Sequence, residues 1–236
     1  MSFFNPVEPI LRCKQEALDV QDRRGLIHIH WKIGDRQLLS MLYTRIDQVF
    51  VVWGWLTALI FLTAQFSTID WGTQATIWSV LTVLATGTMT LLAWFWVKVE
   101  NLEWVIYCWA ALMLAGVALT DYGIFWGCGQ ILVCLCPIWL GLSALGYLCT
   151  GIGMRSRTFI IAALIHVVAI PVLALVPGLQ FLTTGIVMAG SLLLLAEVQW
   201  DMRPPVESSV LSAEQNQFNR AQHQLRQLGK AAYENI

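Results

Sequence analysis

The segment Gly127–Cys149, GCGQILVCLCPIWLGLSALGYLC, is apolar over most of its length and long enough to cross a bilayer as a helix. A membrane span needs about 17 to 25 apolar residues for a hydrocarbon core roughly 30 Å thick. Five further segments of this kind occur in the chain. The predicted spans are Val49–Thr68, Thr76–Val97, Leu102–Thr120, Trp126–Cys149, Phe159–Val176 and Leu179–Val198.

The composition supports an integral membrane protein. Hydrophobic residues make up 57% of the chain, charged residues only 12%, and the mean hydropathy is +0.64. Soluble domains carry about 25% charged residues. The predicted spans lack the alternation of a membrane barrel, so helices are the expected spanning structure. The expected fold class is therefore an all-α polytopic protein with six transmembrane helices.

The distribution of basic residues predicts the orientation. All 14 Lys and Arg residues lie before the first span, between spans two and three, between spans four and five, or after the sixth. The opposite loops, around Asp70, Asp121 and Gly178, carry none. The positive-inside rule then places both termini in the cytoplasm of a bacterial plasma membrane or its equivalent at an internal or organellar membrane. We expect a cytoplasmic N-terminal segment at 1–46, a membrane domain at 47–200 and a cytoplasmic tail at 201–236.

Three elements are predicted before the first span. A helix is expected over Val7–Gln21, and the alternation of isoleucine and tryptophan over Ile27–Ile33 favours a strand or an extended segment on the lipid headgroups. Gln37–Asp47 is predicted as an amphipathic helix because its apolar residues gather on one broad face.

The tail is expected to break at Arg203 and then form a helix. Ser212 and Gln215 have the spacing of a capping box. A narrow apolar seam follows and consists of Phe218, Ala221, Leu225 and Leu228. This seam is too short to predict a coiled coil, and the sequence leaves open whether it docks on the protein's own N-terminal segment, on a partner or on lipid.

The cysteines are interpreted mainly as packing residues. Cys134 and Cys136 would point about 160° apart on a helix, unlike the CxxC spacing of thiol-redox and zinc sites. Cys108 is expected at a depth between Cys136 and Cys149, so no pair is predicted. Small residues of this kind favour close helix contacts in lipid. Cys128 is kept as a possible exposed thiol, and Pro137 predicts a kink in the fourth span.

His166 is the main candidate for a functional residue because it lies near the middle of the fifth span, where ionisable groups are costly. An axial cofactor ligand, a proton relay, a substrate contact and a hydrogen bond between helices all remain open. Thr82, Thr86 and Thr90 form a second candidate, a polar stripe on the second span. These hydroxyls either line a polar path or bond the carbonyl one turn back.

The leading functional hypothesis is a non-enzymatic accessory subunit, assembly factor or scaffold of a membrane complex. The expected partners are membrane lipids and other membrane proteins or further copies of the chain, with no nucleic acid. A small-solute transporter or channel around His166 is the first alternative, and a membrane cofactor-binding or thiol-redox protein the second. No catalytic motif, metal site or particular cofactor is predicted, and the paired Trp53-x-Trp55 and Trp94-x-Trp96 do not establish an internal repeat.

Overall fold

The protein is described by a computed structural model over residues 3–5, 8–15, 17–33 and 36–233. The long helices at the centre of the molecule are α2 (Arg45–Phe66), α3 (Trp71–Val99), α4 (Glu103–Phe125), α6 (Leu135–Met154), α7 (Arg157–Val172) and α8 (Gln180–Glu197). All six are long and apolar enough to cross a membrane, with α7 continued by the 3-10 turn η1 (Leu173–Leu175). The chain is a multi-pass membrane protein.

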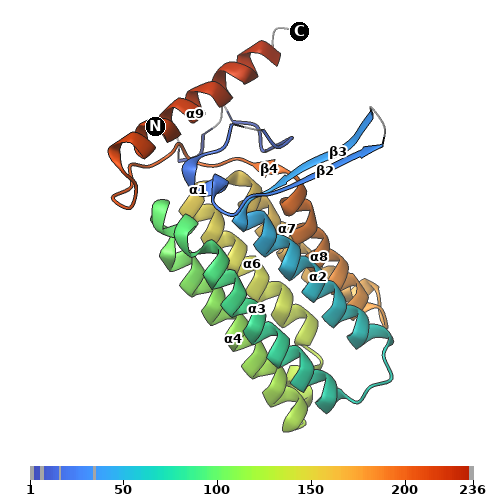
Figure 1. Ribbon diagram of the computed structural model, residues 1–236. Helices are drawn as coiled ribbons and strands as arrows, with labels where there is room; N and C mark the ends of the chain where they lie inside the picture. The colour runs from blue at the N-terminus through green and yellow to red at the C-terminus, as the bar shows by residue number, and fades with distance from the viewer. Residues whose placement is uncertain (1–2, 6–7, 16, 34–35, 234–236) are drawn as a thin grey trace.

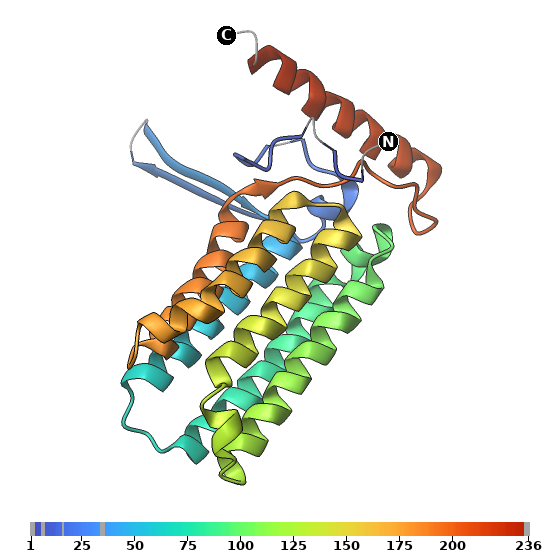
Figure 2. The same ribbon diagram turned by 180° about the vertical axis from the view of Figure 1, so that it is seen from behind.

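The six helices form a closed ring. Each helix contacts the next along the chain, and α8 returns to pack along α2 (Figures 1 and 2). Both terminal segments lie at one end of this bundle, which we call the terminal face (Figure 1). The other end, the far end, carries the connections at 67–70, 126–134 and 176–179.

A β-hairpin precedes the first long helix and projects from the terminal face (Figure 1). Strand β2 (Ile27–Ile33) pairs antiparallel with β3 (Arg36–Tyr43). The strand expected at Ile27–Ile33 is confirmed, whereas the helix expected at Gln37–Asp47 is wrong. The β-ladder takes the backbone bonds of that segment as far as Tyr43, and Thr44 then starts α2 through a capping box with Asp47.

The helix expected over Val7–Gln21 is also wrong. Among the described residues of this range, which leave out 7 and 16, helix occurs only where α1 (Val20–Arg23) begins. Leu11–Arg12 instead form β1, which pairs with β4 (Gln199–Trp200). The backbone N–H of Asp201 extends this pairing by donating to the Ile10 carbonyl over 3.2 Å. A backbone whose bonds are taken by a partner segment cannot also form a helix, so a tertiary contact overrides the local pattern.

Asp201 ties the end of α8 to the start of α7. Its carboxylate accepts hydrogen bonds from the backbone N–H groups of Arg157 and Thr158, both at 3.0 Å, which are the first two residues of α7. Ser156 and the side chains of Arg157 and Thr158 donate to the same carboxylate. A carboxylate from a distant segment thus takes the place of an N-terminal cap, where the helix dipole favours negative charge.

The fourth predicted span is not one continuous helix. A short helix, α5 (Gly129–Leu132), ends before Cys134, and α6 starts afresh at Leu135. The kink predicted at Pro137 is therefore wrong. Pro137 lies in the first turn of α6, where its missing N–H would have no partner within the helix in any case.

A reciprocal contact between two tryptophans and two glycines joins α4 and α6. A Cβ atom on Gly116 would lie 2.7 Å from the Trp139 ring, and one on Gly146 would lie 2.6 Å from the Trp109 ring. Each indole therefore rests on a glycine of the opposite helix. We call these four residues the Trp–Gly clamp.

Two threonines complete the clamp. The indole N–H of Trp109 donates to Thr150 over 3.0 Å, and that of Trp139 donates to Thr120 over 3.1 Å. Both threonine hydroxyls in turn donate to a clamp glycine carbonyl one turn back on their own helix. The sequence carries the pattern W-x6-G-x3-T-x2-G twice, from Trp109 and again from Trp139, 30 residues apart. The pairs Trp53-x-Trp55 and Trp94-x-Trp96 do not belong to this repeat, which relates Trp109 to Trp139.

The helix α9 (Ala213–Tyr233) lies across the terminal face (Figures 1 and 2). Its start shows the predicted capping box, with Ser212 and Gln215 bonded reciprocally at 3.0 and 3.2 Å. Asn219 and Arg226 then fasten it to the N-terminal segment. Asn219 bonds Val20 and Gln21, and the Arg226 guanidinium meets both carboxylate oxygens of Asp19.

We expect Gly146→Ala to destabilise the bundle by about 1 to 3 kcal/mol, because the added methyl group must displace the Trp109 ring. Gly141→Ala is the matched control on the same helix, since a Cβ there meets nothing within 4 Å. The control should leave stability unchanged or raise it by up to about 1 kcal/mol, because alanine favours helix. Unfolding in detergent measures both variants, and equal stabilities would show that the clamp contributes little.

Candidate functional site

A cavity of about 150 Å³ lies inside the helix ring. Its wall takes side chains from all six long helices, and along α2 the lining residues run from Ile46 to Ala64. That is roughly 27 Å of helix at about 1.5 Å per residue. The cavity is thus long and narrow and follows the bundle axis. Among the lining residues, which all belong to the described part of the chain, there is no charged side chain.

His166 of α7 reaches this cavity and is fully buried. Its Nδ1 lies 2.8 Å from the Ala162 carbonyl oxygen one turn back. Its Nε2 is buried and has no hydrogen-bond partner among the described residues. A buried polar atom without a partner is rare in folded proteins and calls for a function or a bound molecule. The structure thus places the histidine candidate at the cavity wall.

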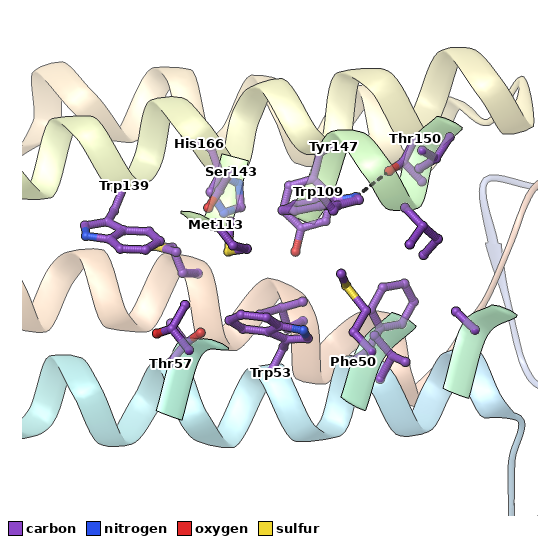
Figure 3. A pocket seen from close by; sticks show the side chains of 18 of the residues that line it. Phe50, Trp53, Thr57, Trp109, Met113, Trp139, Ser143, Tyr147, Thr150 and His166 are labelled. Carbon is purple, nitrogen blue, oxygen red and sulfur yellow. Dashed lines mark hydrogen bonds between the residues drawn. The ribbon is translucent and has the colours of Figure 1, made fainter. Parts of the chain in front are cut away.

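Two further polar groups belong to residues of the cavity lining, Trp53 and Tyr147. The Trp53 Nε1 of α2 is buried and likewise has no partner within the described residues. Figure 3 shows Trp53 and Thr57 on one side of the cavity and Tyr147 of α6 on the other, with the Tyr147 hydroxyl pointing across toward α2. The Tyr147 ring packs against His166, with ring centroids 4.9 Å apart.

The walls around these groups are aromatic and sulfur-rich. The clamp tryptophans Trp109 and Trp139, together with Met89, Met113 and Met188, line the cavity. Such surfaces bind planar or aliphatic groups through dispersion, and methionine sulfur adds favourable contacts to aromatic rings. The cavity therefore combines an apolar wall with a few unmatched hydrogen-bonding atoms, which is the usual make-up of a small-molecule site.

The threonine stripe contributes one residue to the cavity. Thr82 lines it, whereas the hydroxyls of Thr86 and Thr90 donate to the carbonyls of Thr82 and Thr86 at 2.8 and 2.9 Å. These two hydroxyls are thus bonded within their own helix. The stripe offers at most Thr82 to a polar path.

The cysteines are spread over several environments. Cys128 lies at the far end and is partly exposed, and Cys136 is buried against Leu140. Cys108 of α4 and Cys149 of α6 are near enough to interact, and both are free thiols. Cys108 therefore lies nearer to the level of Cys149 than the sequence predicts. The two helices are offset by the clamp, which a depth estimate from sequence ignores. The described residues contain no group of three or more metal ligands.

A second, polar cavity of about 100 Å³ lies at the terminal face. It is separated from the central one by Ile46, Trp96 and Trp200, which line both. Around it Trp96 donates to Asp22 over 2.9 Å, and Gln21 donates to Glu100 over 2.9 Å. These contacts fasten α1 to the end of α3, above the mouth of the central cavity.

Two carboxyl groups of this polar cavity have raised pKa values. Burial and, to a smaller extent, the nearby charge of Asp19 together raise the pKa of Asp22 to about 7. Burial also raises the pKa of Glu100 to about 7, against the opposing effect of Arg203. Both groups therefore bind protons more tightly in the docked structure than they would in an open chain, where carboxyl pKa values lie near 4.

The apolar seam of the tail lies largely away from these contacts. Phe218 is partly buried beneath the guanidinium of Arg23, whereas Ala221 and Leu225 are exposed. The side chain of Leu228 lies outside the described part of the chain. The face of α9 that meets the N-terminal segment is instead the polar stripe of Asn219 and Arg226. A pattern search for apolar residues could not find it.

Comparison with protein-family models, with curated proteins and with solved structures finds no match for this chain. The argument for function therefore rests on the cavity and its residues.

Docking of α1 and α9 on the terminal face should weaken as the pH rises from about 6 to 8. Asp22 and Glu100 are protonated in the docked structure below their pKa of about 7, so the stabilisation is fully present at low pH and is lost through that value. Trypsin cleavage at Arg220 and Arg226 in α9 reports the undocking.

The variant Asp22→Asn with Glu100→Gln removes both titrating groups and serves as the reference at each pH. The ratio of the wild-type cleavage rate to the variant cleavage rate should rise between pH 6 and pH 8. Because both rates are measured at the same pH, the ratio cancels the pH dependence of the protease itself. Glu214→Gln, at an exposed position of α9, should behave like the wild type. A flat ratio would mean that these carboxyls do not control docking.

Proposed function

We propose that this protein holds a small, lipid-soluble molecule in its central cavity, as a non-enzymatic accessory component of a membrane. The observation that carries the proposal is the fully buried Nε2 of His166, which has no partner among the described residues and lies at an apolar cavity. A bound molecule would supply the missing partner and fill the space.

The size of the cavity is sufficient for such a molecule. An apolar cavity of about 150 Å³ is known to bind benzene or xenon, and this one has the same volume. Its length along the bundle suits a ring with an aliphatic extension. An empty cavity loses the dispersion contacts of its lining atoms, so a ligand that fits would stabilise the bundle.

The lining supports binding rather than reaction or ion-coupled transport. The described wall residues include no carboxylate, lysine or arginine that would couple an ion or serve as acid and base. The threonine stripe, the second candidate for a polar path beside His166, is largely bonded to its own backbone. Holding a ligand is also compatible with service in a larger membrane complex, whose members would be other membrane proteins or further copies of the chain.

We further propose that both termini lie in the cytoplasm or its equivalent compartment. All 14 Lys and Arg residues belong to segments at the terminal face or to helix ends close to it, and the far-end loops carry none. The positive-inside rule then orients the terminal face inward. The pH-sensitive docking of α9 would accordingly respond to cytoplasmic pH.

Filling the cavity should abolish ligand binding. Ser143→Phe puts a ring into the cavity, where Ser143 is buried and lines the wall. Leu145→Phe is the matched control, because Leu145 is 47% exposed on the same helix. Native mass spectrometry of gently purified protein should show an added small-molecule mass in the wild type and the control and lose it in Ser143→Phe. The absence of an added mass from the wild type and from both variants would refute the proposal.

A reporter fused to the tail tests the orientation. Green fluorescent protein after residue 236 should fluoresce, and alkaline phosphatase inserted at Gly178 should be active, because the first reporter needs the cytoplasm and the second an oxidising exterior. The reverse pattern would overturn the inward placement of the terminal face.

A further inference from the structure

The bonding state of His166 restricts the chemistry of the ligand. The Ala162 carbonyl can only accept, so the 2.8 Å contact requires a proton on Nδ1. A second proton would make a buried cation, and no carboxylate is found among the described residues of the wall. The imidazole is therefore neutral, and Nε2 carries a lone pair. The atom that faces the cavity is an acceptor and needs a donor.

Trp53 has the opposite requirement. An indole N–H can only donate, and the buried Nε1 of Trp53 has no acceptor among the described residues. The cavity lining thus includes an unmatched acceptor on α7 and unmatched donors on Trp53 of α2 and on Trp200 of β4. The Tyr147 hydroxyl, which points across the cavity toward α2, can serve either role (Figure 3).

A hydroxyl group meets both requirements, because one oxygen donates its proton and accepts through its lone pairs. A carbonyl or ether oxygen could bond Trp53 but would leave Nε2 unsatisfied, and a pure hydrocarbon would leave both atoms unsatisfied. Each unmatched buried atom costs about 1 to 3 kcal/mol. Building on the ligand-holding function proposed above, we infer that the ligand is a lipid-soluble alcohol or phenol whose hydroxyl donates to Nε2 of His166.

The ring next to the hydroxyl would meet aromatic walls. Tyr147 and the clamp tryptophan Trp109 are in edge contact, with ring centroids 5.4 Å apart, and both line the cavity. Trp139 and Met113 continue the same wall (Figure 3). A phenolic or quinol-type ring offers such a wall more contact area than a hydroxyl on a plain chain, so rings are the preferred form within this class.

A matched pair of probes tests the inference directly. p-Cresol and p-xylene have nearly the same shape and differ by one hydroxyl in place of one methyl group. We expect p-cresol to bind the wild type about 5-fold more tightly than p-xylene after correction for partition into detergent, since one net hydrogen bond to His166 is worth about 1 kcal/mol. The readout is quenching of tryptophan fluorescence.

One variant assigns the effect to its residue. His166→Phe removes the acceptor and keeps a ring. It should reduce the preference for p-cresol to about 2-fold or less while p-xylene still binds. Binding of p-xylene also shows that a variant has kept its fold.

The outcomes separate the two proposals. Equal binding of the two probes by the wild type would overturn the hydroxyl inference and leave the ligand-holding function in place. Binding of neither probe would overturn both. Nitrogen NMR of the histidines, with His166→Phe to assign the signal, should show the proton on Nδ1, and a proton on Nε2 would also overturn the inference.

Discussion

The Trp–Gly clamp between α4 and α6 is the contact from which the rest of the site follows. A buried indole needs both a flat surface and an acceptor for its N–H. Glycine supplies the flat surface by letting the ring approach the backbone. Threonine supplies the acceptor, with 3.0 and 3.1 Å between the indole nitrogens and the threonine hydroxyl oxygens. Because the arrangement is reciprocal, it fixes the offset of the two helices. Small residues have this role in lipid, where no hydrophobic force drives helices together.

The clamp also positions the functional residue. Tyr147 follows the clamp residue Gly146 directly, and its ring lies 5.4 Å from Trp109 and 4.9 Å from His166. A shift of α4 against α6 would therefore move the ring that holds the imidazole. Large aromatic rings surround the cavity. Among the described residues, no side chain of the lining bonds to Nε2 of His166. The clamp residue Trp109 and the unmatched His166 thus contact the same ring, that of Tyr147.

The sequence predicts those parts of this fold that depend on composition. The six spans and the strand at Ile27–Ile33 follow from hydropathy and alternation, and Ser212 with Gln215 follows from local cap chemistry. Parts that depend on partners far along the chain were predicted wrongly. Leu11–Arg12 became a strand only because Gln199–Trp200 lie beside them.

The candidate site shows the same division. Burial of His166 could be predicted from its place in a span, but its free Nε2 could not, because that depends on which atoms six helices bring near it. Trp53 lies near the end of a span in the sequence, and only the structure shows that it lines the cavity with a buried N–H that has no partner among the described residues. The repeat W-x6-G-x3-T-x2-G was visible in the sequence and would have indicated that α4 and α6 pair reciprocally.

The most direct test of a ligand-holding cavity is an electron cryomicroscopy map of the protein purified gently from its own membrane and enlarged with a bound antibody fragment. We expect density that is not protein next to Nε2 of His166, extending along the bundle axis. A map in which side chains close the cavity and Nε2 bonds to protein would contradict a ligand-holding cavity.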